Sequence, residues 1–427
     1  MDATGTRVSL EDLQKVVGEG HAREGGAEDA VEGVEPSFLA EPGSVEEMSA
    51  LLRLANDASL SVAPRGGGTK THIGNPPRGL GLILSTERMD EMIEHVPGDQ
   101  VVRVQGGIRL SDLQDRLAVE DQMLGVDPPE KDEGATVGGI VAANSSGPRR
   151  LRYGTLRDLI IGIKVVLPDG GVAQAGGKVV KNVAGYDLSK LFTGSLGTLG
   201  LIAECNFRLH PRPEAARAVA VELGDTKQAG DAAQTIIHAQ IVPSAVELHW
   251  GEEAKALTVL IEGIPPAVEA QAERVSFLLK SFGQPRTLGG EAAGPLGPPV
   301  PPGAREDEVE IKISAPPVDL MGVLDSVEGA CSRRGVTPRI TGHAGTGVTY
   351  VSLPGEDEET QAAVTEELRE IWVRRGGSLI VLKAPPSLKK RVDVWGPAGD
   401  YLALMRRVKE KFDPRGILNP GRFVGGI

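Results

Sequence analysis

The spacing of apolar and polar positions predicts an amphipathic helix over residues 44–59. Leu51, Leu52 and Leu54 fall on one face, and Ser44 is followed three positions later by Glu47, as in a capping box. A second helix is predicted from Leu110 to Leu117. Short apolar runs predict strands at 60–63, 81–84, 101–104 and 159–167. Because these elements do not alternate as regular β-α-β units, the pattern favours an α+β fold.

The character of the chain changes after the segment Leu209–Pro213. Glycine-rich segments become rare there, and a new α+β region begins near Val219. A Gly/Pro-rich stretch at 283–303 is typical of a loop or linker within that second region. We therefore expect four parts: an acidic N-terminal tail at 1–30, a first domain at 31–213, a second domain at 214–400, and a C-terminal segment at 401–427 that returns to the first domain.

Composition excludes several classes of protein. The chain has 427 residues with 40% hydrophobic positions, which is enough for large cores. A formal charge of -13 and only 3% aromatic residues argue against nucleic acid as a partner. The acidic first thirty residues do not resemble a signal peptide, and no stretch is apolar enough to span a bilayer. The expectation is a cytoplasmic protein that reaches the inner membrane, if at all, through partners.

The cysteines and histidines exclude a local metal or disulfide framework. Cys205 and Cys331 are far apart and belong to no C-x-x-C pair, so we expect both to be small buried hydrophobic residues. The seven histidines show no spacing typical of a metal site, and we assign no metal ligand. The chain also cannot hold an iron–sulfur cluster of its own.

Two glycine-rich segments carry the clearest chemical signal. Three adjacent glycines follow the predicted strand in Pro64–Lys70, and a second backbone-exposing run lies at Ala135–Asn144. Without Cβ atoms, the main-chain N–H groups of such segments can approach an anion. Glycine triplets are also typical of ordinary turns, so the first loop alone leaves both interpretations open. Neither a Walker lysine nor a Rossmann fingerprint is in register.

Several further motifs follow these segments in a fixed order. They are Pro64-Arg65-Gly66-Gly67-Gly68-Thr69, Asp127-Pro128-Pro129, Ala135-Thr136-Val137-Gly138-Gly139 with Asn144 and Gly147, Arg152-Tyr153-Gly154, Lys181-Asn182-Val183-Ala184-Gly185-Tyr186-Asp187-Leu188, Gly194-Ser195-Leu196-Gly197-Thr198-Leu199-Gly200, and the C-terminal Asp413-Pro414-Arg415-Gly416-Ile417-Leu418-Asn419-Pro420-Gly421-Arg422. The set resembles the FAD-binding PCMH-type domain of the vanillyl-alcohol oxidase superfamily. The closing motif is similar to that of its FAD-linked 2-hydroxy-acid oxidases.

This resemblance implies a two-subdomain PCMH-type FAD-binding domain followed by an α+β cap domain. By the same resemblance, the residues that line the FAD are Arg65, Gly66, Gly67, Gly68, Thr69, Pro128, Thr136, Gly138, Gly139, Asn144, Gly147, Tyr153, Gly154, Gly200, Ile202 and Asn419. Lys181 and Tyr186 would pass near the flavin, although Tyr186 could equally fill the core. Covalent relatives carry a histidine at the end of the first loop. Gly68 stands there in this chain, so we predict noncovalent FAD.

The catalytic assignment rests on a partly matching motif. Related dehydrogenases carry G-H-x-G-x-G-x-x-H and a later E-H-G, whereas this chain has His343 but Tyr350 at the second histidine position, and no Glu-His-Gly. His343 could take the hydroxyl proton of a substrate, or it could be a structural remnant, since neither a metal nor a carboxylate partner is evident. Arg339 could hold a substrate carboxylate or simply be solvated.

The resemblance is greatest to the E-type, FAD-binding subunit of glycolate oxidase. It implies hydride transfer from a small 2-hydroxy acid such as glycolate to FAD. Electrons would then pass onward within a complex that holds a second flavoprotein subunit and an iron–sulfur subunit. Two alternatives stay open: a noncatalytic scaffold subunit of such a complex, and a self-sufficient FAD-dependent alcohol or aldonolactone oxidase. Dioxygen turnover by the isolated chain would indicate the last of these.

Overall fold

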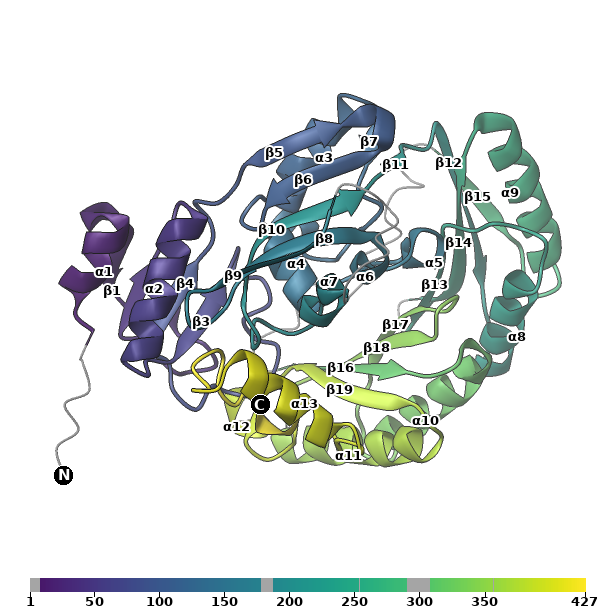
Figure 1. The fold of residues 1–427 in the computed structure, drawn as a ribbon. Coiled ribbons are helices and arrows are strands. Elements are labelled where there is room, and N and C mark those ends of the chain that lie inside the picture. Colours follow the sequence, from purple (N-terminus) through teal and green to yellow (C-terminus); the bar gives the residue numbers. More distant parts are fainter. Residues whose placement is uncertain (1–7, 178–186, 253, 290–307, 356) are drawn as a thin grey trace.

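Three large sheets and one two-stranded ribbon carry the fold (Figure 1). The computed structural model describes residues 8–177, 187–252, 254–289, 308–355 and 357–427. The predicted Lys181 and Tyr186, and most of the predicted loop at 283–303, lie outside these residues.

The first sheet has the order β1-β2-β4-β3, in which β4 pairs in parallel with both β2 and β3. Its strands are β1 (Ala22–Glu24), β2 (Phe38–Ala40), β3 (Val62–Arg65) and β4 (Leu82–Ser85), and its helices are α1 (Leu10–Val17) and α2 (Val45–Asp57). The predicted helix at 44–59 is confirmed as α2, and the Ser44 side chain accepts the N–H of Glu47. The Glu47 carboxylate closes the cap on the N–H of Gly43 instead of that of Ser44.

Residues 8–30 are not the acidic tail that the sequence predicts, because they pack onto this sheet. α1 begins with a complete capping box between Ser9 and Asp12, and it buries Leu13 and Val17. β1 then pairs with β2 as the edge strand. A short apolar stripe, long enough for one packed helix, lies among the many acidic residues of this segment.

The second sheet is antiparallel, with the order β5-β6-β10-β8-β9. Its strands are β5 (Met92–Val96), β6 (Val101–Gln105), β8 (Ile160–Val166), β9 (Val172–Gly176) and β10 (Leu201–Arg208). The helices beside it are α3 (Leu110–Ala118), α4 (Val137–Ala143), α5 (Arg150–Tyr153), α6 (Leu156–Leu159) and α7 (Leu188–Phe192). The predicted strands at 81–84, 101–104 and 159–167 and the predicted helix at 110–117 are confirmed within a residue or two. β7 (Gln122–Met123) and β11 (His210–Pro211) form the two-stranded ribbon.

The third sheet is antiparallel and eight-stranded, with the order β15-β12-β14-β13-β17-β18-β16-β19. Its strands are β12 (Ala215–Glu222), β13 (Ala245–Trp250), β14 (Lys255–Gly263), β15 (Arg286–Gly289), β16 (Val309–Ser314), β17 (Arg339–His343), β18 (Val348–Leu353) and β19 (Ser378–Lys383). Four helices cover its outer face in Figure 1: α8 (Thr226–Ile237), α9 (Pro265–Leu279), α10 (Leu320–Ser332) and α11 (Glu358–Arg374).

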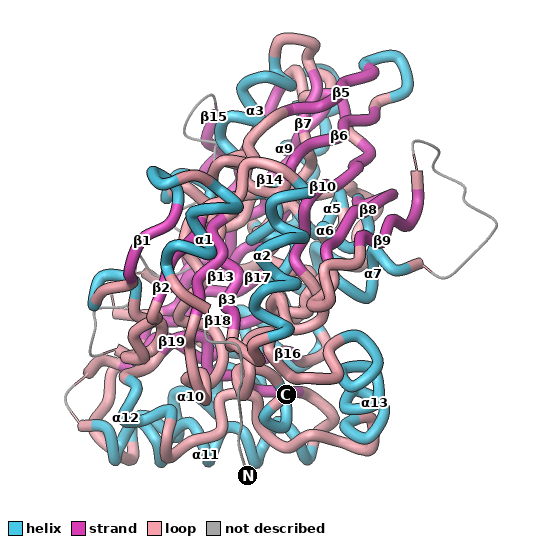
Figure 2. Tube along the Cα trace, turned by 60° about the vertical axis from the view of Figure 1, so that its left-hand side comes forward, coloured by secondary structure: helices cyan, strands magenta, loops and turns pink. Residues whose placement is uncertain are grey.

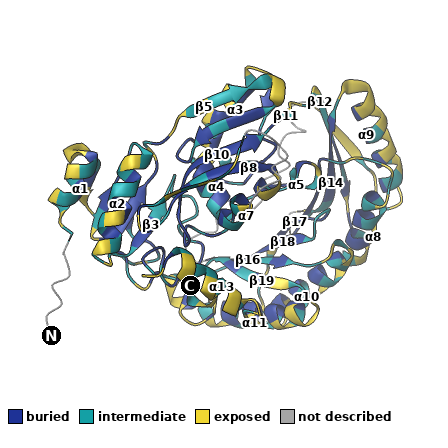
Figure 3. Cartoon of the chain, in the orientation of Figure 1, coloured by how far each residue is buried: buried dark blue, intermediate teal, exposed yellow. Residues whose placement is uncertain are grey.

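Alternation along β16 shows how the two faces of this sheet differ. Val309, Ile311 and Ile313 join the apolar core under the helices, whereas Glu310 and Lys312 point to the opposite face. Figure 3 shows the same division as dark-blue strands beneath helices whose outer surfaces are exposed. The sheet therefore presents a polar face toward the first half of the molecule.

The C-terminal segment, with α13 (Leu402–Phe412), comes back to the first sheet, and the short helix α12 (Pro386–Lys389) precedes it. Val62 donates its N–H to Ile417 O, and Asn419 donates its N–H to Val62 O. Figure 2 shows α12 and α13 on either side of the lower edge, beside α11. This return brings the closing motif next to the first glycine loop.

Two further expectations concern the two cysteines and membrane-spanning helices. Cys205 and Cys331 are both free and buried, as predicted. Within the described residues, none of the helices combines the length and apolar character that a bilayer crossing requires.

Candidate functional site: a glycine cleft and a wide polar cavity

A narrow cavity of about 110 Å³ lies between the two glycine segments, and we call it the glycine cleft. The first loop, the start of α4, the end of the 194–200 turn and the closing motif all contribute to it. The predicted FAD-lining residues found here are Arg65, Gly66, Gly67, Gly68, Thr69, Thr136, Gly138, Gly139, Gly200, Ile202 and Asn419. The fold thus brings together segments that are far apart in the sequence.

Close packing explains why glycines occupy the loop. A Cβ on Gly66 would lie 2.0 Å from Thr136 Oγ1, and one on Gly67 would lie 1.9 Å from Gly134 O. Both distances are far below van der Waals contact, so the two segments can approach each other only as bare backbone. Gly68 adopts a φ of +75°, which side chains disfavour.

The donors and acceptors in the cleft fit a ligand with both hydrogen-bonding types. In the described part of the chain, the N–H groups of Gly66, Gly67 and Gly68 donate to no protein acceptor. The Oδ1 atom of Asn419 in the cleft, and that of Asn144 next to the cleft residue Ala143, are buried without a partner among the described residues. Free backbone donors suit a diphosphate, and orphaned amide oxygens suit the N–H and O–H groups of FAD. The residues present therefore fit this cofactor.

Arg65 has a structural partner in addition to its place in the cleft. Its Nη1 lies 3.1 Å from Asp29 Oδ1, and Arg23 binds the same buried carboxylate at 2.6 Å. The N-terminal segment that was expected to be a tail thus anchors the first glycine loop through Asp29.

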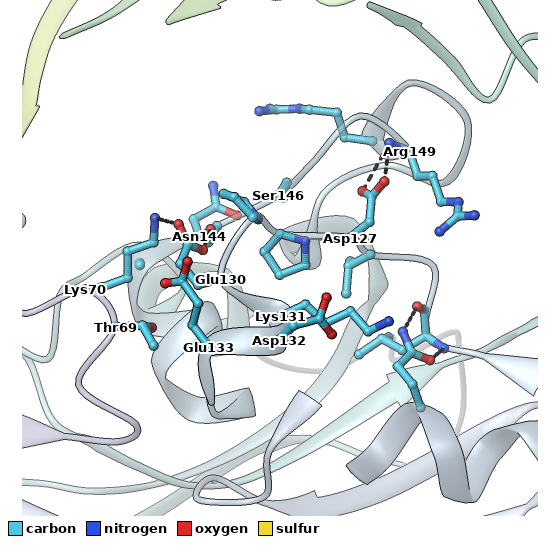
Figure 4. Close-up of a pocket in the computed structure, with 18 of the residues that line it drawn as sticks. Thr69, Lys70, Asp127, Glu130, Lys131, Asp132, Glu133, Asn144, Ser146 and Arg149 are labelled. Atoms are coloured by element: carbon cyan, nitrogen blue, oxygen red, sulfur yellow. Dashed lines mark hydrogen bonds and ion pairs between the residues drawn. The ribbon is translucent and has the colours of Figure 1, made fainter. Parts of the chain in front are cut away.

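A wide cavity of about 960 Å³ adjoins the cleft, and the two share Thr69, Lys70, Ile73 and Ala143 as lining residues. Pro128 and Asn144, two further predicted FAD-lining residues, lie on its wall. Figure 4 shows Lys70 directed toward Glu130 beside Asn144, and Arg149 next to Asp127 on the opposite side. Lys70 and Glu130 form an ion pair.

Arg149 and Asp127 organise the side of the wide cavity nearest β13. The Arg149 N–H donates to the Asp127 carboxylate at 3.1 and 3.2 Å, while its guanidinium binds Glu262 at 2.6 Å. Burial raises the pKa of Asp127 to about 7, against the opposing effect of Arg149. Burial likewise lowers the pKa of His72, on the cavity wall, to about 3, so its ring is neutral.

The polar face of the third sheet closes the wide cavity. Glu310, Lys312, Tyr350 and Lys383 line it, and Lys312 is the cross-strand neighbour of Tyr350. Burial raises the pKa of the Tyr350 phenol above its ordinary value, so its hydroxyl is a hydrogen-bond donor at neutral pH.

Three predicted FAD-lining residues are not among those that line the cleft or the wide cavity. Gly147 packs so tightly that a Cβ would lie 1.8 Å from Asp127 O. Tyr153 is buried against the His210 ring at 5.0 Å, and Gly154 ends α5 with a φ of +83°. The structure gives these residues packing and turn roles behind the wall.

His343 is buried and has the carboxylate partner that the sequence did not reveal. Its Nδ1 lies 2.8 Å from Glu247 Oε2, because β13 and β17 place the two residues directly opposite each other. Tyr350 meets the His343 ring edge-on at 5.4 Å and lines the wide cavity, whereas His343 is not among the lining residues. In the sequence, Glu247 is a single carboxylate between the apolar residues Val246 and Leu248, and nothing there links it to His343.

The position of Arg339 does not support its predicted role in holding a substrate carboxylate. Its Nη2 lies 2.7 Å from Glu308 Oε2 and 3.3 Å from Ser352 Oγ, and its side chain is half exposed. It is not among the residues that line either cavity. Its place at the start of β17 pairs it with an internal carboxylate instead of a ligand.

Comparisons with known proteins define the class of protein. Residues 36–176 match the model described as an FAD binding domain, and residues 212–273 and 395–423 match the C-terminal domain of FAD linked oxidases. The fold is that of alkyldihydroxyacetonephosphate synthase, with a TM-score of 0.74 and 18% identity over 99% of this chain and 88% of that one. It is equally that of p-cresol methylhydroxylase, at 0.74 and 17% identity over 97% and 95%. The class is thus an FAD-dependent oxidoreductase.

Sequence relatives span nearly the whole chain. Glycolate oxidase subunit GlcD of Bacillus subtilis is 28% identical over 91% of this chain and 88% of its own length. D-lactate dehydrogenase of Archaeoglobus fulgidus is 29% identical over 90% and 91%. An FAD binding domain and the C-terminal domain of FAD linked oxidases thus match in that order along the chain.

The absence of a histidine at Gly68 leads to a prediction about the flavin linkage. Because glycine offers no side chain for a covalent bond, we expect denaturation in guanidinium or acid to release all of the FAD. The measurement is the flavin absorbance that remains with the protein after denaturation and gel filtration. Flavin retained on the unfolded chain would contradict noncovalent binding.

Proposed function

We propose that the chain oxidises the CH–OH group of a small 2-hydroxy acid, such as glycolate, as the FAD-binding subunit of an oxidase or dehydrogenase complex. One observation carries the proposal: the glycine cleft, with its free backbone donors, shares lining residues with a wide cavity whose far side carries Lys312, Lys383 and Tyr350. The names of the relatives, a glycolate oxidase subunit, a D-lactate dehydrogenase and a D-2-hydroxyglutarate dehydrogenase, support this substrate class.

The residues of this chain would act as follows. Bound FAD supplies the acceptor of a hydride equivalent. Tyr350 donates a hydrogen bond to the substrate from the cavity wall. His343, held by Glu247 behind the Tyr350 ring, is the proposed acceptor of the hydroxyl proton, and the proton would have to reach it through a bridging water or a shift of Tyr350. Electrons would then leave to a partner that carries an iron–sulfur cluster, or to a quinone or dioxygen.

A second candidate is a noncatalytic subunit of the same complex. His343 favours it, because the ring is buried behind the wall and Tyr350 stands at the position of the second histidine of related enzymes. The free donors of the glycine cleft oppose it, since a scaffold would have no physical need for them.

The test is an absorption spectrum of the purified chain, followed by anaerobic addition of glycolate and then of D-lactate. We expect oxidised-flavin bands that bleach with at least one of the two acids. Bands that persist in the isolated chain, but bleach when partner subunits are added, would place the chemistry in a partner. A colourless protein that FAD cannot reconstitute would refute the proposal. The control substrate is glycolamide, the uncharged amide of glycolate.

A further inference from the structure

The polar face of the third sheet holds an unusual lysine. Lys312 lies in the middle of β16, which pairs with β18 on one side and with the edge strand β19 on the other, so a strand paired on both sides carries a cation. Tyr350 on β18 is its direct cross-strand neighbour, and both side chains line the wide cavity. Cross-strand neighbours have their Cβ atoms roughly 5 Å apart, so both can contact one small ligand.

Arg150 reaches the same part of the wide cavity from α5, across from the sheet. Its charge acts on both Lys312 and Tyr350, and all three residues line the same cavity. The structure therefore gathers an ammonium, a guanidinium and a phenol hydroxyl from three separate elements.

These two cations lack the carboxylate partners that other cations of the wide cavity have. Lys70 is paired with Glu130, and Arg149 with Glu262. In the part of the chain that the structure describes, Arg150 and Lys312 form no ion pair and no side-chain hydrogen bond. Two like charges held together at a partly buried wall repel each other and lose hydration, so the arrangement favours an anion between them.

The electrostatics of Lys312 agree with this geometry. Burial lowers the pKa of its ammonium to about 8, and the charges of Arg150 and Lys70 lower it further in the same direction. Both of these neighbours are cations. A bound anion would reverse their effect and stabilise the protonated lysine.

Carboxylates match this set of donors. A guanidinium offers a planar fork, an ammonium offers a point charge, and the Tyr350 hydroxyl offers one more donor, so both oxygens of a carboxylate can be satisfied. We propose that Arg150, Lys312 and Tyr350 form a carboxylate-binding subsite that selects small 2-hydroxy acids over neutral alcohols. The identity of the substrate rests on the proposed function, but binding of a carboxylate does not.

The experiment uses the FAD-loaded chain and oxalate, a small carboxylate with no C–H bond to oxidise. Titration calorimetry measures its Kd for the natural chain and for K312M, K312R and K131M. Lys131 lines the same cavity but is flanked by Asp132 and Glu133, so K131M is the matched control. We expect K312M to raise the Kd by about 10- to 100-fold, because it removes a charged hydrogen bond. K312R should retain most of the affinity, and K131M should leave the Kd unchanged.

The outcomes separate the subsite from the reaction. Oxalate binding that is lost in K312M, in a chain that no 2-hydroxy acid bleaches, would support the subsite and refute the proposed function. Equal Kd values in K312M and K131M would overturn the subsite, whether or not glycolate bleaches the flavin. Loss of FAD from K312M while K131M keeps it would also overturn the subsite, by showing that Lys312 contacts the cofactor. A thermal unfolding transition of K312R equal to that of the natural chain checks the fold.

Discussion

Substitution of Gly67 with alanine is expected to abolish retention of FAD. The new Cβ would lie 1.9 Å from Gly134 O, and a backbone oxygen in a packed turn cannot move away cheaply. The first loop must therefore withdraw from the second glycine segment, which opens the cleft and displaces its free N–H donors. We expect G67A to purify without yellow colour and to lose about 3 kcal/mol of unfolding free energy. The measurements are the ratio of flavin to protein absorbance and a urea transition.

The matched control for this prediction is G98A. Gly98 lies in the same half of the molecule, and a Cβ there would meet nothing within 4 Å. We expect G98A to keep its full FAD content, because it changes the composition equally without touching the cleft. A yellow G67A with the flavin content of the natural chain would show that the loop tolerates a side chain, and that the cleft is not shaped by bare backbone.

Local signals in the sequence were enough to predict much of the first half of the fold. The cap formed by Ser44 and the apolar spacing of α2 depend only on neighbouring residues, and the helix forms where they indicate it. The acidic N-terminal segment could not be interpreted in the same way. Leu13 and Val17 of its helix are apolar positions within a charged sequence, and their burial depends on a sheet that forms from later residues.

The glycine cleft could be predicted because its motifs require special backbone geometry, which leaves glycine in the sequence itself. The polar face of the third sheet requires no special backbone geometry, so no residue type in the sequence identifies it. Glu247 meets His343, and Lys312 meets Tyr350, only through the pairing of strands that are not adjacent in the chain. Strand register is set by the whole sheet, so no local pattern identifies these neighbours. Arg339 precedes His343 by four residues in the sequence, but the strand register places it opposite Ser352, where it pairs with Glu308.

The pair of Glu247 and His343 leads to the second large expected effect, a loss of stability in E247A. Both side chains are almost fully buried, so removal of the carboxylate leaves the imidazole without its hydrogen-bond partner inside the sheet. The unsatisfied ring nitrogen and the cavity left inside the sheet together cost about 3 to 5 kcal/mol of unfolding free energy. The measurement is urea denaturation at pH 7, followed by tryptophan fluorescence, since Trp250 lies on the same strand as Glu247.

The control is E222A, on β12 of the same sheet. Glu222 pairs with Arg286 on the surface, where both side chains are more than two-thirds exposed, so we expect a loss below about 1 kcal/mol.

E247Q keeps the shape of the Glu247 side chain and removes its charge. Burial raises the pKa of Glu247, and a group with a raised folded pKa contributes stability below its unfolded pKa that is lost as pH rises through the folded one. The charged form therefore opposes folding at neutral pH, and E247Q should lose much less stability than E247A. Equal losses in E247A and E222A would show that the buried pair does not hold the sheet together.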